Sequence, residues 1–124
     1  MIKDRRFYNR FELSDTAVVL FAPNGEEISG KITDISEESI GIDIPISDKD
    51  KFEVHGTFMF QFADNYNQGS QSKTKVVTAL AIIIRHEVKD SVCHLGCIVR
   101  DEAFRSYATK RKFSAYYNNV AKTL

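Results

Sequence analysis

The chain has 124 residues, of which 43% are hydrophobic and 27% charged, and its formal net charge at pH 7 is zero. This length and composition fit a single globular domain and exclude disordered and collagen-like chains. The charges are unevenly distributed, because the stretch 26–53 is mainly acidic and both ends are basic, which suits a localised anion site better than a basic stripe along a nucleic-acid duplex.

The first half of the chain has the composition of β-strands. Residues 16–22 are rich in β-formers and precede turn residues at 23–25, so 26–33 is expected to return as the second strand of a hairpin. Isoleucines then occupy every second position from 40 to 46. This period of two predicts a strand with one buried face.

Three further strands are expected after this alternation. Residues 56–62 carry three phenylalanines in phase, residues 64–73 are expected to form a polar loop, and residues 74–88 are a long β-rich run. A tight turn at 89–91 leads into a last strand at 92–100. Six strands with short connections predict an all-β fold with antiparallel pairing, in a barrel or a sandwich.

The pattern changes at Asp101, and residues 102–122 are predicted to form a C-terminal α-helix. Two groups of apolar side chains fall on roughly opposite faces of this helix. They are Phe104, Tyr107 and Ala108 on one face, and Phe113, Tyr117 and Val120 on the other. Either the helix breaks near Thr109, or one of its faces contacts something outside the barrel.

Neither a secretory leader nor a membrane span is expected. The first six residues are mostly charged and lack the apolar run of a signal peptide, and no apolar stretch reaches the length of a span, about 18 residues. The expected location is therefore the cytoplasm, without membrane insertion. Cys93 and Cys97 do not have the spacing of a zinc or redox pair and are interpreted as buried thiols.

No arrangement of residues typical of an enzyme is present. The histidines, His55, His86 and His94, are isolated and lack the spacings of metal sites or of a base beside a nucleophile. No glycine motif that cradles phosphate occurs. The sequence therefore predicts no catalytic residue, no metal and no cofactor. The basic run 110–112 is interpreted as a solvated helix face.

An arginine-rich segment lies just before the first expected strand. It contains Arg5, Arg6 and Arg10. Arginine presents a planar fork of donors that matches phosphate oxygens and the O6/N7 edge of guanine. Taken alone, the segment is a solvated basic terminus.

A second polar segment, 34–41, lies between the second and third expected strands. Asp34 and Ser36 favour a turn there, because their side chains bond nearby backbone donors. An outward-facing carboxylate can also accept hydrogen bonds from N1 and N2 of guanine. Taken alone, this segment is a turn.

Together the two segments resemble the signature of the PilZ family, in which an RxxxR motif precedes the first strand and a [D/N]xSxxG motif follows the second. Arg6 and Arg10 match the first motif, and Asp34 and Ser36 match the start of the second. The resemblance covers nearly the whole chain and implies a six-stranded antiparallel β-barrel with a C-terminal α-helix. It divides the single domain into an arm, 1–13, that carries RxxxR, and a barrel with its helix, 14–124.

The resemblance also implies a function, that of a bacterial signalling effector that binds cyclic di-GMP and changes its conformation or partner surface on binding. Arg6 and Arg10 would clamp phosphate and the guanine edge, while Asp34 and Ser36 would bond guanine. Arg5 resembles an arginine of family members that bind two stacked ligands, so two molecules per chain are expected. An unidentified protein partner would respond to the change.

The match departs from the family motif at one position, where the final glycine is replaced by Ser39. If this position needs a positive φ, a serine there costs about 1 kcal/mol. Gly41, two residues later, is expected to relax the turn. Ser39 and Gly41 are both included among the expected ligand-binding residues.

Two alternatives remain open. The first, favoured by Ser39, is a degenerate PilZ domain that binds no nucleotide and serves as a protein-interaction adaptor. The second is a small barrel that binds single-stranded nucleic acid through Phe58, Phe60 and Phe62. Such a stripe is more often part of a core, and no nucleic-acid partner is expected.

Overall fold

The computed structural model describes the backbone of residues 10–68 and 70–123, and the side chains of residues 16–67 and 70–112. Six strands, a short 3-10 helix and one α-helix follow each other along the chain. They are β1 (Arg10–Phe21), β2 (Glu27–Ser36), β3 (Ser39–Pro45), η1 (Ile46–Lys51), β4 (Thr57–Gln68), β5 (Gln71–Lys89), β6 (Val92–Val99) and α2 (Glu102–Thr123).

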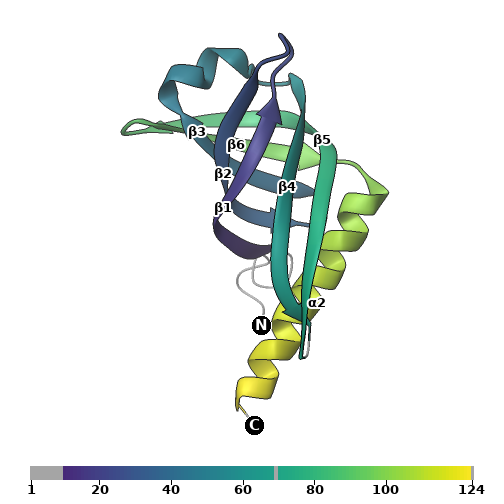
Figure 1. Cartoon of the computed structure of the whole chain (residues 1–124). Coiled ribbons are helices and arrows are strands. Elements are labelled where there is room, and N and C mark those ends of the chain that lie inside the picture. The colour runs from purple at the N-terminus through teal and green to yellow at the C-terminus, as the bar shows by residue number, and fades with distance from the viewer. Residues whose placement is uncertain (1–9, 69, 124) are drawn as a thin grey trace, which may run out of the picture.

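The strands form a closed barrel in the order β1-β2-β3-β6-β5-β4, and each neighbouring pair is antiparallel. Figure 1 shows the barrel, with α2 running beside the far end of the long β4–β5 hairpin. The predicted six-stranded antiparallel barrel with a C-terminal helix is confirmed. Closure leaves no sheet edge exposed along the paired strands.

Several element boundaries differ from the sequence predictions. β2 extends to Ser36 instead of ending at residue 33, so Asp34 and Ser36 lie in a strand and not in the predicted turn. β1 begins at Arg10 rather than at residue 16, and the alternation from Ile40 ends at Pro45, because η1 starts at Ile46. The expected loop 64–73 instead continues the hairpin, with pairs from Asp64 opposite Lys75 to Gln68 opposite Gln71. Strand pairing satisfies the backbone there, and apart from Asp64 and Tyr66 the described side chains of this stretch are exposed to water.

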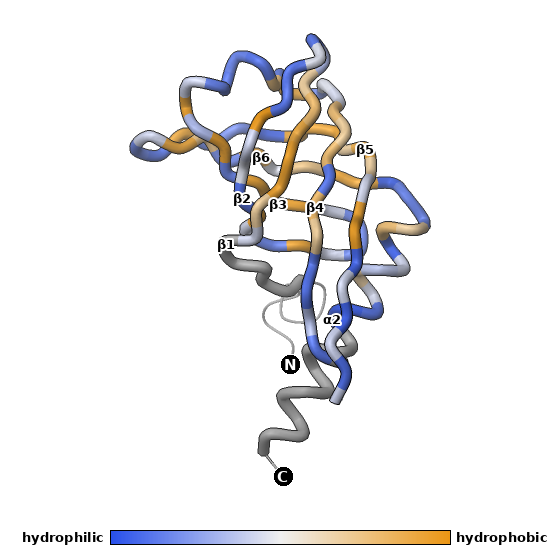
Figure 2. Tube along the Cα trace, in the orientation of Figure 1, coloured by the Kyte–Doolittle hydropathy of each residue, from blue (hydrophilic) through white to orange (hydrophobic). Residues whose placement is uncertain are grey.

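The barrel interior is filled by the residues that the alternation predicted to be buried. Ile40, Ile42 and Ile44 are between 0% and 2% exposed, and the three phenylalanines of β4 are at most 3% exposed. Figure 2 shows orange, hydrophobic stretches along the strands of the barrel, whereas the far end of the β4–β5 hairpin is mainly blue and hydrophilic. Because the rings of Phe58, Phe60 and Phe62 are inside, they cannot stack on bases, and the nucleic-acid alternative loses the feature that suggested it.

Helix α2 packs its first half against the barrel. The carboxylate of Asp101 caps the helix by accepting a hydrogen bond of 2.8 Å from the Phe104 N–H. Phe104 is 1% exposed and its ring meets that of Phe60 edge-on, with centroids 5.9 Å apart. The helix runs unbroken through Thr109. The second predicted face, which contains Phe113, lies outside the described side chains.

A buried polar cluster holds α2 to β4. Asp64 is 4% exposed, and its Oδ2 accepts hydrogen bonds from the Tyr107 hydroxyl at 2.7 Å and from Arg111 Nε at 2.8 Å. The Arg111 guanidinium also lies 5.0 Å from the ring centroid of Tyr66. Burial, together with the bond to Asp64, raises the pKa of Tyr107, so the hydroxyl remains a donor. In residues 10–68 and 70–123, no helix is long and apolar enough to span a membrane.

Candidate ligand-binding site

Two strands on the same side of the barrel contain an irregularity in their register. In β2 the pairing with β3 shifts between Ile32 and Asp34, and in β5 the pairing with β6 shifts between Ile83 and Arg85. Each shift has the form of a β-bulge, in which an extra residue bends the strand and redirects the side chain that follows. The side chains redirected here are those of Asp34 and Arg85.

The shifts align four residues in one row across four strands. Asp34 of β2 pairs with Gly41 of β3, Gly41 pairs with Gly96 of β6, and Gly96 pairs with Arg85 of β5. A carboxylate and a guanidinium therefore flank two adjacent glycines. Glycine in the interior of a strand often marks a close approach by another group.

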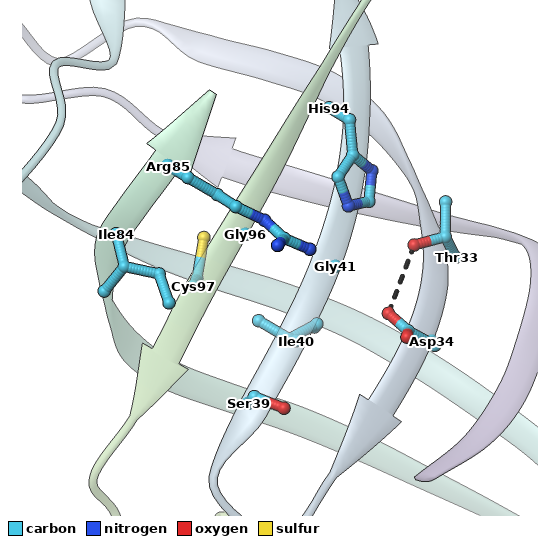
Figure 3. A pocket seen from close by; sticks show the side chains of 10 residues that line it. All are labelled: Thr33, Asp34, Ser39, Ile40, Gly41, Ile84, Arg85, His94, Gly96 and Cys97. Atoms are coloured by element: carbon cyan, nitrogen blue, oxygen red, sulfur yellow. Dashed lines mark hydrogen bonds between the residues drawn. The ribbon is translucent and has the colours of Figure 1, made fainter. Parts of the chain in front are cut away.

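The two glycines are required by the side chains beside them. A Cβ on Gly41 would collide with Oδ1 of Asp34, and would lie 2.6 Å from Oγ1 of Thr33. A Cβ on Gly96 would lie 2.8 Å from Nε and 2.9 Å from Cγ of Arg85. The bare backbone at these positions thus forms a floor over which Asp34 and Arg85 extend from opposite sides, as Figure 3 shows.

This floor belongs to a pocket of about 400 Å³ on the outer surface of the barrel. Its lining comes from β2, β3, β5 and β6. The lining residues are Thr33, Asp34, Ser39, Ile40, Gly41, Ile84, Arg85, His94, Gly96 and Cys97. The pocket is large enough for a nucleobase and offers an acceptor at one end and a cation at the other.

His94 and Thr33 define the sides of the pocket near Asp34. The Nδ1 of His94 lies 2.7 Å from Oδ1 of Asp43, so the imidazole is oriented by a carboxylate outside the pocket. Its Cε1 would be 3.0 Å from a Cβ on Gly41. The Thr33 hydroxyl donates a hydrogen bond of 3.3 Å to Oδ1 of Asp34. The acidic end is therefore a small polar network.

Ser36 and Ser39 bond to each other at the turn between β2 and β3. Their hydroxyl oxygens are 2.6 Å apart, and Ser36 Oγ also accepts a hydrogen bond of 3.3 Å from the Glu38 N–H. Ser39 starts β3, and the positive φ values in the described part of the chain are at His55, Asp90 and Gly25. The steric cost anticipated for a serine at position 39 is therefore absent.

Gly41 also has a different role from the expected one. It lies within β3, paired with Asp34, and forms part of the pocket floor rather than relaxing the preceding turn. The absence of a Cβ there leaves space for the Asp34 carboxylate.

The residues predicted to bind ligand are placed as follows. Asp34, Ser39 and Gly41 line the pocket, and Ser36 reaches it through its bond to Ser39. The backbone of Arg10 pairs with Ser36, so the end of the first motif lies beside the second. Arg5 and Arg6 lie outside the described residues, as does most of the predicted arm 1–13.

Seven pocket residues were not predicted as site residues, namely Thr33, Ile40, Ile84, Arg85, His94, Gly96 and Cys97. Gly96 carries a signal that could have been used, since it interrupts an apolar strand in phase with an outward position, as Gly41 does. Arg85 had no such signal. Its proximity to Asp34 depends on the bulge in β5 and on the pairing of β3 with β6.

The turn beside the pocket is also bonded to α2. Glu37 accepts a hydrogen bond of 3.1 Å from Lys112 Nζ, and Glu38 accepts one of 2.7 Å from Arg105. A second hollow of about 360 Å³ lies between this turn and Arg105. The position of the turn and that of the first half of α2 are therefore linked by two ion pairs.

The cysteines behave as buried thiols. Cys93 is 0% and Cys97 is 2% exposed, and burial raises the pKa of Cys97 to about 12. At neutral pH its thiol is protonated, which makes it a poor nucleophile and metal ligand. The described residues contain no cluster of three His, Cys, Asp or Glu side chains that could hold a metal ion.

Solved structures with the same fold as this chain include a Bacillus subtilis protein and a domain from Escherichia coli. No family model and no curated protein sequence matches it. The inhibitor of motility MotI (DgrA) of Bacillus subtilis superposes with a TM-score of 0.62 at 16% identity, covering 90% of this chain and 53% of that one. This chain thus spans about half the length of MotI.

The second structure is the PilZ domain of YcgR from Escherichia coli, solved with cyclic di-GMP. It superposes with a TM-score of 0.58 at 14% identity, covering 92% of this chain and 95% of that domain. The similarity thus extends over the complete domain rather than over a shared fragment. The chain has the fold of a PilZ domain.

Proposed function

We propose that this protein is a cyclic di-GMP effector of the PilZ type. The observation that carries the proposal is the meeting of the two motifs, since Arg10 at the end of RxxxR pairs with Ser36 of the second motif. Asp34 of that motif stands at one end of the pocket. The similarly folded YcgR domain was solved with cyclic di-GMP, which supports this choice of ligand.

The chemistry of the site matches guanine and phosphate. The Asp34 carboxylate can accept hydrogen bonds from N1 and N2 of guanine, which adenine cannot donate. The hydroxyls of Ser36 and Ser39 can donate to or accept from the base and the phosphate. Arg5, Arg6 and Arg10 would supply charge-assisted bonds to phosphate oxygens and to the O6/N7 edge. Two ligand molecules per chain remain our expectation, because of Arg5.

The output would be a changed surface rather than a reaction. The turn that carries Ser36 is bonded to α2 through Glu37 and Glu38. A ligand that moves this turn would therefore also displace α2, and a protein partner in the cytoplasm would recognise the difference. We propose no catalytic role.

Calorimetric titration with cyclic di-GMP tests the proposal. We expect a dissociation constant in the micromolar range or tighter, about −8 kcal/mol. Affinity should fall with added salt, because the ligand carries two phosphates. Absence of both heat and a shift in melting temperature at ligand concentrations near a millimolar would contradict it.

A nucleotide-free adaptor is the second candidate function. The bond of 2.6 Å between Ser36 and Ser39 favours it, because Ser39 engages a hydroxyl that the ligand would need. Ser39→Gly releases this hydroxyl and restores the residue found in the family motif. If the parent protein fails to bind and Ser39→Gly binds, the adaptor is the correct interpretation. Equal binding by both proteins would exclude it.

A further inference from the structure

We propose that Arg85 is a further ligand-binding residue and that its guanidinium plane stacks against the nucleobase held in the pocket. The inference rests on the proposed function, because the base is that of the cyclic dinucleotide. It adds a residue from β5 to a site so far assigned to the N-terminal segment, the end of β2 and the start of β3.

Arg85 is positioned over the site by its strand. The register shift at Ile84 places Arg85 opposite Gly96. Its Nε and Cγ pass 2.8 Å and 2.9 Å from the point where a Cβ of Gly96 would stand. Figure 3 shows the side chain crossing Gly96 toward Gly41, from the side opposite Asp34. Any residue larger than glycine at position 96 would displace it.

Among the described residues around the site, the cationic side chain of Arg85 differs from those of Arg105 and Lys112 in having no bonding partner. Arg105 bonds Glu38, Lys112 bonds Glu37 and His94 bonds Asp43. In the described part of the chain, the exposed Arg85 guanidinium makes no hydrogen bond and no ion pair. Its face and its five donors are available to a ligand.

The charge at the other end of the pocket decides which part of the ligand lies there. A phosphate in the hollow beside Asp34 would be repelled by the carboxylate, whereas the N1–H and N2–H groups of guanine would be attracted. The base therefore occupies the hollow. The floor beneath it is bare backbone at Gly41 and Gly96, which suits a flat group.

Stacking is the contact that a planar cation can make with such a base. Arginine stacks on aromatic faces, and lysine has no plane with which to do so. Removing one stacking side chain from a nucleotide site generally costs about 1–3 kcal/mol, or about 5- to 150-fold in affinity. The identity of the substituent at position 85 thus distinguishes stacking from simple charge attraction.

Three substitutions test the inference by calorimetric titration with cyclic di-GMP. Arg85→Met removes both plane and charge, Arg85→Lys keeps the charge alone, and Arg85→Trp keeps a plane alone. We expect Arg85→Met and Arg85→Lys each to weaken binding about tenfold or more, and Arg85→Trp to bind within about threefold of the parent. Arg100→Met, at an exposed arginine outside the pocket, is the control and should bind like the parent.

Fluorescence gives a second readout of the same contact. The chain contains no tryptophan, so the indole emission of the Arg85→Trp variant reports on position 85 alone, and stacking on guanine should quench it at saturation. Thermal denaturation verifies that every variant is folded.

The outcomes distinguish failure of the stacking inference from failure of the proposed function. The stacking inference is overturned if Arg85→Lys binds like the parent, if Arg85→Met does, or if a folded Arg85→Trp binds no better than Arg85→Met. Unquenched emission from saturated Arg85→Trp also overturns it. If the parent protein binds no cyclic di-GMP, the proposed function fails and the inference fails with it. If the parent protein binds cyclic di-GMP and substitutions of Arg85 leave the affinity unchanged, the stacking inference is refuted and the proposed function stands.

Discussion

Two aspartate–arginine pairs in the structure differ in their geometry. Asp64 and Arg111 form an ion pair, whereas Asp34 and Arg85 lie at opposite ends of the pocket. Under α2, Arg111 Nε lies 2.8 Å from Oδ2 of Asp64, which is 4% exposed. In the pocket, two glycines separate Asp34 from Arg85. In the first pair each charged group bonds the other, and this ion pair holds α2 to β4.

The second pair leaves a space between opposite charges, and this is the arrangement expected of a binding site. Burial accounts for the difference. A buried carboxylate needs its partners within the protein, because it cannot obtain them from water. Asp34 is only half-buried and Arg85 is exposed beside a surface pocket, so their charged groups can also contact a ligand.

The largest expected effect is the loss of stability on removing the buried carboxylate. Asp64→Ala would leave the Tyr107 hydroxyl and the Arg111 guanidinium without their shared acceptor. We expect a loss of about 3–5 kcal/mol in the free energy of unfolding, measured by urea denaturation. Asp34→Ala is the matched variant and should destabilise far less. Equal losses would mean that the two aspartates have the same structural role.

The next largest effect is on the affinity for cyclic di-GMP. Here Asp34 is the important aspartate, whereas Asp64 is the important one for stability. Asp34→Ala should reduce the free energy of cyclic di-GMP binding by about 1.5–3 kcal/mol, as should Arg6→Ala and Arg10→Ala, since each removes a charge-assisted hydrogen bond. Calorimetry against the parent protein measures this loss. Parental affinity in any one of the three variants would remove that residue from the site.

A methyl group on the pocket floor should have a similar but smaller effect on affinity. In Gly41→Ala the added Cβ would collide with Oδ1 of Asp34 and displace the carboxylate. We expect binding to weaken by about 1–2 kcal/mol, the range for a misplaced hydrogen-bonding group. Unaltered affinity in a folded Gly41→Ala protein would show that the carboxylate does not bind from its present position.

The smallest effect is expected at the ion pair between the turn and α2. Arg105 and Glu38 bond at 2.7 Å, but their side chains are 58% and 69% exposed. Glu38→Gln should therefore change the free energy of unfolding by at most about 1 kcal/mol. A larger change in urea denaturation would mean that this contact helps to fix α2, as the buried pair does.

The barrel was predictable because its strands each have one buried face. The alternation through Ile40, Ile42 and Ile44 and through the phenylalanines of β4 identifies inward positions directly. The outer part of the β4–β5 hairpin was not predictable, because polar residues on both faces leave no period. The early start of β1 at Arg10 was missed, although Phe11 and Leu13 alternate with polar residues there.

The site could be predicted only on the side that is local in sequence. Asp34, Ser36 and Ser39 lie within six residues of each other, at the end of β2 and the start of β3, so a short motif contains them. The other side required two features that no pattern of residue types encodes. These are the register shift before Arg85 and the pairing of Gly41 with Gly96, two residues far apart in the chain.

Backbone amide chemical shifts, followed during titration with cyclic di-GMP, test the central claim most directly. The claim is that a guanine base occupies the hollow between Asp34 and Arg85. It predicts that the largest shift changes occur at Asp34, Gly41, Arg85 and Gly96, and that Asp64 changes little. Saturable binding that leaves these four amides unchanged would place the ligand elsewhere and contradict the account.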